Sequence, residues 1–150
     1  MQARNVEMYI NTLNISNNLG QSTGAYALLL KYKNNITEYN YAMPNSLIED
    51  LQLNAIATGL EFYNQPCNVD IYTTSSFFKK VLDTNLIKRY ELANFKDINN
   101  NDILHKRIWQ SISASLKTHT INKITIDYNK AYILRCKELC IEAINELLDE

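Results

Sequence analysis

The fold class is set by two stretches, Tyr26-Ala27-Leu28-Leu29-Leu30-Lys31-Tyr32 and Ile36-Thr37-Glu38-Tyr39-Asn40-Tyr41, which lie close together in the sequence. The first is almost wholly apolar, as buried strands are, and the second alternates, as half-buried strands do. Between them, Asn34-Asn35 supplies residues that tolerate the positive φ angles of hairpin turns. Val6-Glu7-Met8-Tyr9-Ile10 alternates too, so the first third of the chain predicts three antiparallel strands.

The remaining two thirds predict helices and strands in turn. A capping box, Ser46-Leu47-Ile48-Glu49, predicts a helix that continues to about Leu60. Further helices are expected after Ser75-Ser76, after Asp102 and in the last segment, where Ile133, Cys136, Cys140, Ala143 and Leu147 would face inward. Strands are expected at 69–73 and 121–128. This order predicts one α/β domain over residues 1–150, with a mixed five-stranded sheet of three antiparallel strands and then parallel crossovers, flanked by about four helices.

Composition indicates an ordinary globular chain of 150 residues with a formal net charge of −1. The sequence has no apolar run of membrane-spanning length and no signal-peptide core, so we expect an intracellular protein with no membrane partner. The three cysteines have no histidine at zinc-ligand spacing and are expected to be buried free thiols. Tyr9 and Trp109 are assigned to packing, as is Tyr72.

Six stretches resemble, in the same order, those of a known family. They are Val6-Glu7-Met8-Tyr9, Gly24-Ala25-Tyr26, Ala55 to Glu61, Cys67 to Thr73, Ile108-Trp109-Gln110 with Leu116-Lys117-Thr118-His119, and Arg135-Cys136-Lys137-Glu138-Leu139. The family they resemble is ribonuclease HI, and the resemblance extends along nearly the whole chain. It implies a ribonuclease-H-like fold.

The resemblance also implies where catalytic residues should be. In that family three aspartates and a glutamate hold two divalent ions that activate water and stabilise the leaving oxygen of a phosphodiester. Those four positions fall on Asn11, Gln52, Thr74 and Lys137. The family's mobile histidine before the last helix is also missing, and the loop there is shorter. The resemblance therefore predicts a catalytically inactive relative, a pseudo-nuclease without metal or cofactor.

Three alternatives to simple loss of the site remain open. Glu49 or Asp50 could stand in for the glutamate, although that shift would destroy the match from Ala55 to Glu61. An acidic site could be rebuilt from other residues, namely Asp70, Asp127 or Glu138. The third alternative is deliberate inactivation; natural divergence is favoured over it because Thr and Lys are not isosteric replacements for Asp.

One binding hypothesis is that the domain still holds nucleic acid, with RNA or an RNA–DNA hybrid as the ligand. Lys137 could pair with the phosphate that the metal ions would have contacted, as a phosphate clamp. The family's basic segment corresponds here to Lys79, Lys80, Lys88, Arg89, Lys96, Lys106 and Arg107. A mixed solvated surface is the competing interpretation, because acidic residues are interspersed there.

The other hypothesis, which the sequence slightly favours, is a scaffold or interaction subunit of a larger nucleic-acid-processing assembly. The last helix ends in an acidic run, Glu138, Glu142, Glu146, Asp149 and Glu150, which could meet a basic protein partner or could simply be solvated. A small-molecule substrate is not expected. The sequence identifies neither the partner nor the oligomeric state.

Overall fold

The structure is a computed structural model that describes residues 3–16, 19–20 and 22–149. Its elements, in chain order, are β1 (Arg4–Ser16), β2 (Ser22–Tyr32), β3 (Asn35–Pro44), α1 (Ile48–Glu61), β4 (Cys67–Thr73), α2 (Phe77–Val81), α3 (Thr84–Leu92), α4 (Lys106–Thr118), β5 (Thr120–Ile126) and α5 (Ala131–Leu148). Among the described helices, none is both long and apolar enough to cross a bilayer.

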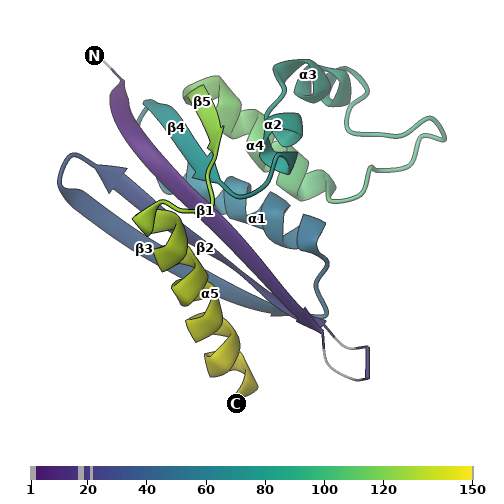
Figure 1. Cartoon of the computed structure of the whole chain (residues 1–150). Coiled ribbons are helices and arrows are strands. Elements are labelled where there is room, and N and C mark those ends of the chain that lie inside the picture. The colour runs from purple at the N-terminus through teal and green to yellow at the C-terminus, as the bar shows by residue number, and fades with distance from the viewer. Residues whose placement is uncertain (1–2, 17–18, 21, 150) are drawn as a thin grey trace.

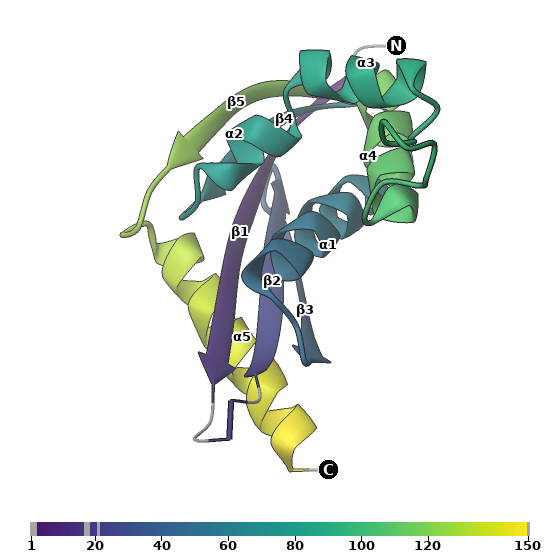
Figure 2. The ribbon, with the colours of Figure 1, turned by 90° about the vertical axis from the view of Figure 1, so that its right-hand side faces the viewer.

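The five strands form one mixed sheet in the order β3-β2-β1-β4-β5. The first three strands pair antiparallel, whereas β4 and β5 join in parallel through helical crossovers. This is the α/β architecture that the sequence predicts. α5 lies alone on one face of the sheet, across β1 to β3, and α1 lies on the other face with α4 packed against it (Figures 1 and 2).

Strand alternation divides the core into two layers. Met8 and Ile10 of β1 point toward α1, whereas Tyr9 points toward α5. Tyr9 stacks on Tyr72 with the ring centroids 4.7 Å apart, and Trp109 is buried between α1 and the helices after β4. All three aromatic rings serve packing, as expected.

The number of helices, the hairpin turn and the start of α1 differ from the sequence prediction. Five helices flank the described part of the sheet, because Asp83 caps a separate α3 by accepting a bond from the Asn85 N–H (2.8 Å). The hairpin turn is Lys33-Asn34, with Lys33 at φ 54°, and Asn35 begins β3. Ser46 is buried and donates to the carbonyl of Met43 (2.9 Å), so the helix is capped from Leu47 instead.

The start of α4 was also wrong in the sequence prediction. Asp102 caps no helix, since α4 begins at Lys106 with His105 in the left-handed region at φ 60°. The Asp102 carboxylate instead accepts from the ammonium groups of Lys96 (2.9 Å) and Lys106 (3.2 Å). At the end of α5, Leu147 is only half-buried and Ile144 provides the core contact.

Candidate functional site

Asn11, Thr74 and Lys137 come together in one pocket of about 340 Å³. The parallel pairing of β1 with β4 runs as far as Ile10 opposite Thr73, so the next residues of the two chain segments emerge side by side. Lys137 arrives from α5, which crosses the same face of the sheet (Figure 1). Three of the four positions implied by the family resemblance are thus neighbours in space.

Asn11 is held by three hydrogen bonds to three parts of the chain. Its Oδ1 accepts from the backbone N–H of Thr12 (2.9 Å) and from the hydroxyl of Thr74 (3.3 Å). Its Nδ2 donates to the backbone carbonyl of Ile133 in the first turn of α5 (3.3 Å). The neutral amide therefore links β1, the end of β4 and α5, and its donor makes a bond that an ionised carboxylate could not make.

The pocket has a mixed polar and apolar lining and no carboxylate among its lining residues. Thr12, Leu13, Tyr128 and Leu134 complete the lining. Lys137 is the sole charged group there, is exposed, and forms no ion pair with any residue in the described part of the chain. The fixed charge of the pocket is therefore positive.

The acids considered for a rebuilt site are engaged elsewhere. Asp127 accepts from the backbone N–H groups of Asn129 and Lys130, which hold the pKa of its carboxyl below the usual value. Asp70 accepts from Asn122, and Glu138 lies 3.6 Å from Arg135. Across the described residues, no group of three or more His, Cys, Asp or Glu side chains has a geometry that could hold a metal ion.

Gln52 is the fourth position implied by the family resemblance. It is buried within α1 and is not among the residues that line the Asn11 pocket. Glu49 and Asp50, the alternatives to it, also face other groups: Asp50 pairs with His105 (2.7 Å), and Glu49 lines a second pocket.

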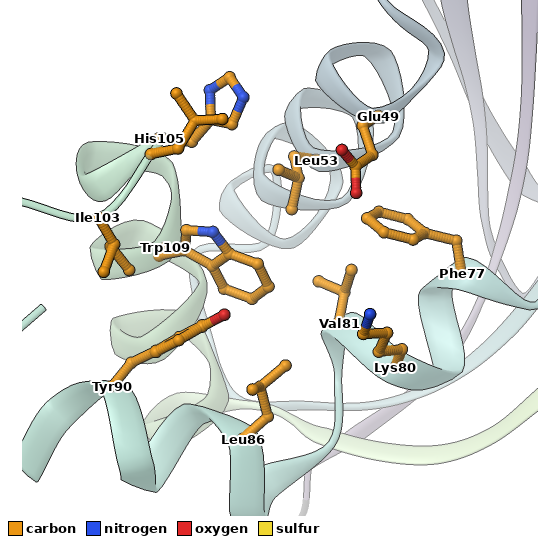
Figure 3. Close-up of a pocket in the computed structure, with 11 residues that line it drawn as sticks. Glu49, Leu53, Phe77, Lys80, Val81, Leu86, Tyr90, Ile103, His105 and Trp109 are labelled. Carbon is orange, nitrogen blue, oxygen red and sulfur yellow. The ribbon is translucent and has the colours of Figure 1, made fainter. Parts of the chain in front are cut away.

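That second pocket lies between α1, α2, α3 and the start of α4 and has a volume of about 210 Å³ (Figure 3). Trp109 and Tyr90 form one wall, with their ring centroids 4.9 Å apart, and Phe77 faces them across the space. Lys80 and Glu49 stand at its edge as opposite charges. Its volume is below the roughly 300 Å³ typical of sites for drug-sized ligands.

The basic residues of the candidate nucleic-acid segment do not converge on the Asn11 pocket. Lys80 borders the Trp109 pocket, Lys88 borders a separate hollow between α3 and α4, and Arg107 lies at the start of α4. Lys96 and Lys106 are both bound to Asp102. Lys79 and Arg89 are on α2 and α3, outside the Asn11 pocket.

Sequence reasoning overlooked two lysines on the uncovered part of the sheet. Lys130 precedes α5 and lies 4.6 Å from the ring centroid of Tyr72, while Lys123 of β5 lies 5.7 Å from it. Lys123 reaches this position because β5 pairs with β4 at Asp70 after an irregularity in register. No local sequence signal reports that register.

No family model matches the chain. Two curated relatives are named ribonuclease H: one from Clostridium botulinum is 23% identical over 82% of this chain and 84% of its own length, and one from Chlorobium phaeobacteroides is 28% identical over 81% and 84%. Over most of its length the chain is thus similar in sequence to proteins named ribonuclease H, as the six stretches of resemblance indicate.

Solved ribonuclease H structures agree with the fold. LC9 ribonuclease H1, a type 1 ribonuclease H with the type 2 active-site motif, matches with a TM-score of 0.77 and 14% identity, over 97% of this chain and 74% of that one. LC11 ribonuclease H1, solved in complex with an RNA/DNA hybrid, matches with a TM-score of 0.60 and 15% identity, over 95% and 99%. At these identities the two structures support the ribonuclease H fold.

Proposed function

We propose that this chain is a ribonuclease H relative that binds nucleic acid without cutting it. The observation that carries the proposal is the composition of the Asn11 pocket, which is lined by neutral polar and apolar groups and a single lysine. A premise of the proposal is that Asn11, Thr74 and Lys137 occupy positions of the family's metal ligands, as the sequence resemblance implies.

The chemistry follows from charge. Divalent ions such as magnesium prefer oxygen ligands, charged ones above all, and the family's reaction needs two such ions at one place. Here Asn11 Oδ1 already accepts two hydrogen bonds, and the Lys137 ammonium would repel a cation that approached the pocket. A phosphate would be attracted by the same ammonium.

We expect Lys137 to act as a fixed counter-charge for one backbone phosphate. It is exposed, and no carboxylate in the described part of the chain pairs with it. Lys123 and Lys130 lie beside Tyr72 on the part of the sheet that α5 does not cover, although Asp70 and Asp127 partly offset their charge there. The related LC11 ribonuclease H1 was solved with an RNA/DNA hybrid, which makes a hybrid the first ligand to try.

The proposal is tested by fluorescence anisotropy with labelled RNA–DNA hybrid, double-stranded RNA, double-stranded DNA and single strands, at several salt concentrations. Lys137→Ala should weaken binding of the preferred duplex about fivefold or more. It should also reduce by about one the slope of the logarithm of the binding constant against the logarithm of the salt concentration. Lys33→Ala, an exposed lysine in the β2–β3 turn, is the matched control and should change affinity far less. Absence of binding at low salt, or equal effects of the two variants, would refute the clamp.

A second candidate function is that of an interaction scaffold in a nucleic-acid-processing assembly. The observation that favours it is the outer face of α5, where large aliphatic side chains are exposed although the inner face of the helix is fully packed. This role needs a protein partner and no intact nuclease site.

A further inference from the structure

The outer face of α5 carries a regular apolar stripe. Leu134, Ile141 and Leu148 are 48%, 42% and 66% exposed, and they follow one another at intervals of seven residues. Residues seven apart lie on nearly the same side of an α-helix, so the three form a row about 21 Å long at 1.5 Å per residue. We refer to these three residues as the α5 stripe.

The stripe is not needed to hold α5 on the sheet. A different set of residues on the opposite side of the helix, including Cys136, Cys140 and Ile144, is buried against β1 and β2. The views in Figures 1 and 2 show α5 as the outermost layer on its side, with no other described element over it. The stripe is therefore an apolar surface that the described fold leaves in water.

The surface around the stripe is acidic. Its carboxylates are Glu38 on β3, Glu138, Glu142 and Glu146 on α5, and Asp149 directly after α5; its cations are Arg135 and Lys137. Arg135 is shared among Glu38 (2.7 Å), Glu142 (3.3 Å) and Glu138 (3.6 Å). Asp149 forms no ion pair with described residues, so negative charge is left uncompensated close to Leu148. Glu146 is also without an ion pair among these residues but lies farther around the helix from the stripe.

The charge around the α5 stripe decides what kind of partner can bind there. A second copy of the chain docked through α5 would place acidic residues against acidic residues, and like charges in an interface oppose association. Three apolar side chains in a row along one side of a helix can serve as anchors for the apolar face of an amphipathic partner helix, and charged residues next to such a row favour partners of opposite sign. An acidic flank therefore selects a basic one.

We propose that the α5 stripe docks a basic amphipathic helix of a protein partner, with apolar residues against Leu134, Ile141 and Leu148 and with lysines or arginines toward Glu138, Glu142 and Asp149. The inference specifies the partner of the scaffold role and rests on that role; of the three stripe residues, Leu134 also lines the Asn11 pocket. A contact through one helix is small, so the complex should be micromolar and sensitive to salt.

The test uses two synthetic, labelled 21-residue helical peptides that share one apolar seam. One carries Lys and Arg at the flanking positions and the other carries Glu there; binding to the whole protein is followed by anisotropy. The basic peptide should bind at micromolar concentration and the acidic peptide at least tenfold more weakly. Binding of the acidic peptide with equal affinity, or no binding of the basic one, would overturn the proposal.

Variants then locate the contact. The double variant Ile141→Ser with Leu148→Ser should weaken basic-peptide binding at least tenfold. The double variant Leu92→Ser with Ile98→Ser removes aliphatic side chains that are 89% and 99% exposed at the end of α3 and in the loop after it, and it should change binding less than twofold. Equal effects of the two double variants would overturn the proposal, because they would show that the peptide does not recognise α5.

A charge variant tests the role of the carboxylates near the stripe, and light scattering of the protein alone tests for a dimer. Glu142→Gln with Asp149→Asn should weaken peptide binding severalfold and flatten its salt dependence, whereas Glu49→Gln, on α1, should do neither. A dimer that is lost in the Ile141→Ser, Leu148→Ser variant would instead identify a second copy as the occupant and overturn the proposal. Neither Ile141 nor Leu148 lines the Asn11 pocket, so hybrid affinity measured on the same variant separates this proposal from the phosphate clamp.

Discussion

Removing the Asn11 amide should destabilise the domain, because that side chain joins three elements. Asn11→Ala deletes the bonds to Thr12 N–H, to the Thr74 hydroxyl and to the Ile133 carbonyl. Thr74→Val keeps the shape of the side chain and deletes only the bond to Asn11. The two variants and their combination form a double-mutant cycle.

The magnitude follows from the number of bonds and their lengths. Each hydrogen bond contributes about 0.5–1.5 kcal/mol net, and the two at 3.3 Å belong at the low end of that range. We therefore expect Asn11→Ala to cost about 2 kcal/mol and Thr74→Val about 1 kcal/mol, with a coupling energy of roughly 0.5–1 kcal/mol. A loss of about 2 kcal/mol should lower Tm by about 4–8 °C in a domain of this size.

The assay is urea unfolding followed by circular dichroism, with thermal unfolding as a second measure. Asn99→Ala is the matched control, since that side chain is exposed in the loop before α4; its effect should be within about 0.5 kcal/mol. An Asn11→Ala variant with an unchanged free energy of unfolding, or additive effects of Asn11→Ala and Thr74→Val on it, would refute the view that the amide is a structural link.

Three other outcomes are expected from buried groups. Burial lowers the pKa of His119, so as pH falls the imidazole is protonated in the unfolded chain before it is protonated in the folded one. The free energy of unfolding should therefore fall as pH drops below about 6.5. Urea unfolding at several pH values should show a smaller fall in His119→Gln. Burial raises the pKa of Cys136 and of Cys140 to about 12, so mass spectrometry should find neither thiol alkylated by iodoacetamide until denaturant is added, and fast labelling of the folded protein would contradict this. Gly24→Ala places a Cβ 2.4 Å from Leu51 Cδ1 and should cost about 1–3 kcal/mol by thermal unfolding; an unchanged Tm would show that the core yields there.

Strands were predictable because their signal is local. The apolar run at 26–32 is β2, buried on both faces between α1 and α5, and the alternation at 6–10 reports the two-layered environment of β1. Helix ends were less predictable, because short polar side chains have several partners to choose from. Ser46 donates to the carbonyl of Met43, and Asp102 accepts from two lysines, although Ser and Asp are both common helix-capping residues.

The candidate site was predictable in part, through the resemblance. It placed Asn11, Thr74 and Lys137 at equivalent family positions, and the structure brings these three together. The bond from Asn11 to the Ile133 carbonyl could not be foreseen, because it depends on how α5 crosses the end of β1. For the same reason the sequence could not show that Lys123 gathers with Lys130 at Tyr72, a placement set by the register of β5.

The central claim, binding without cutting, is tested most directly by a cleavage assay. End-labelled RNA–DNA hybrid is incubated with a molar excess of the protein in magnesium or in manganese, beside an active ribonuclease H, and complex formation is followed by anisotropy in the same buffers. We predict a bound hybrid whose RNA strand stays intact in either metal. Metal-dependent cleavage that chelator abolishes and that co-purifies with the folded domain would contradict the account.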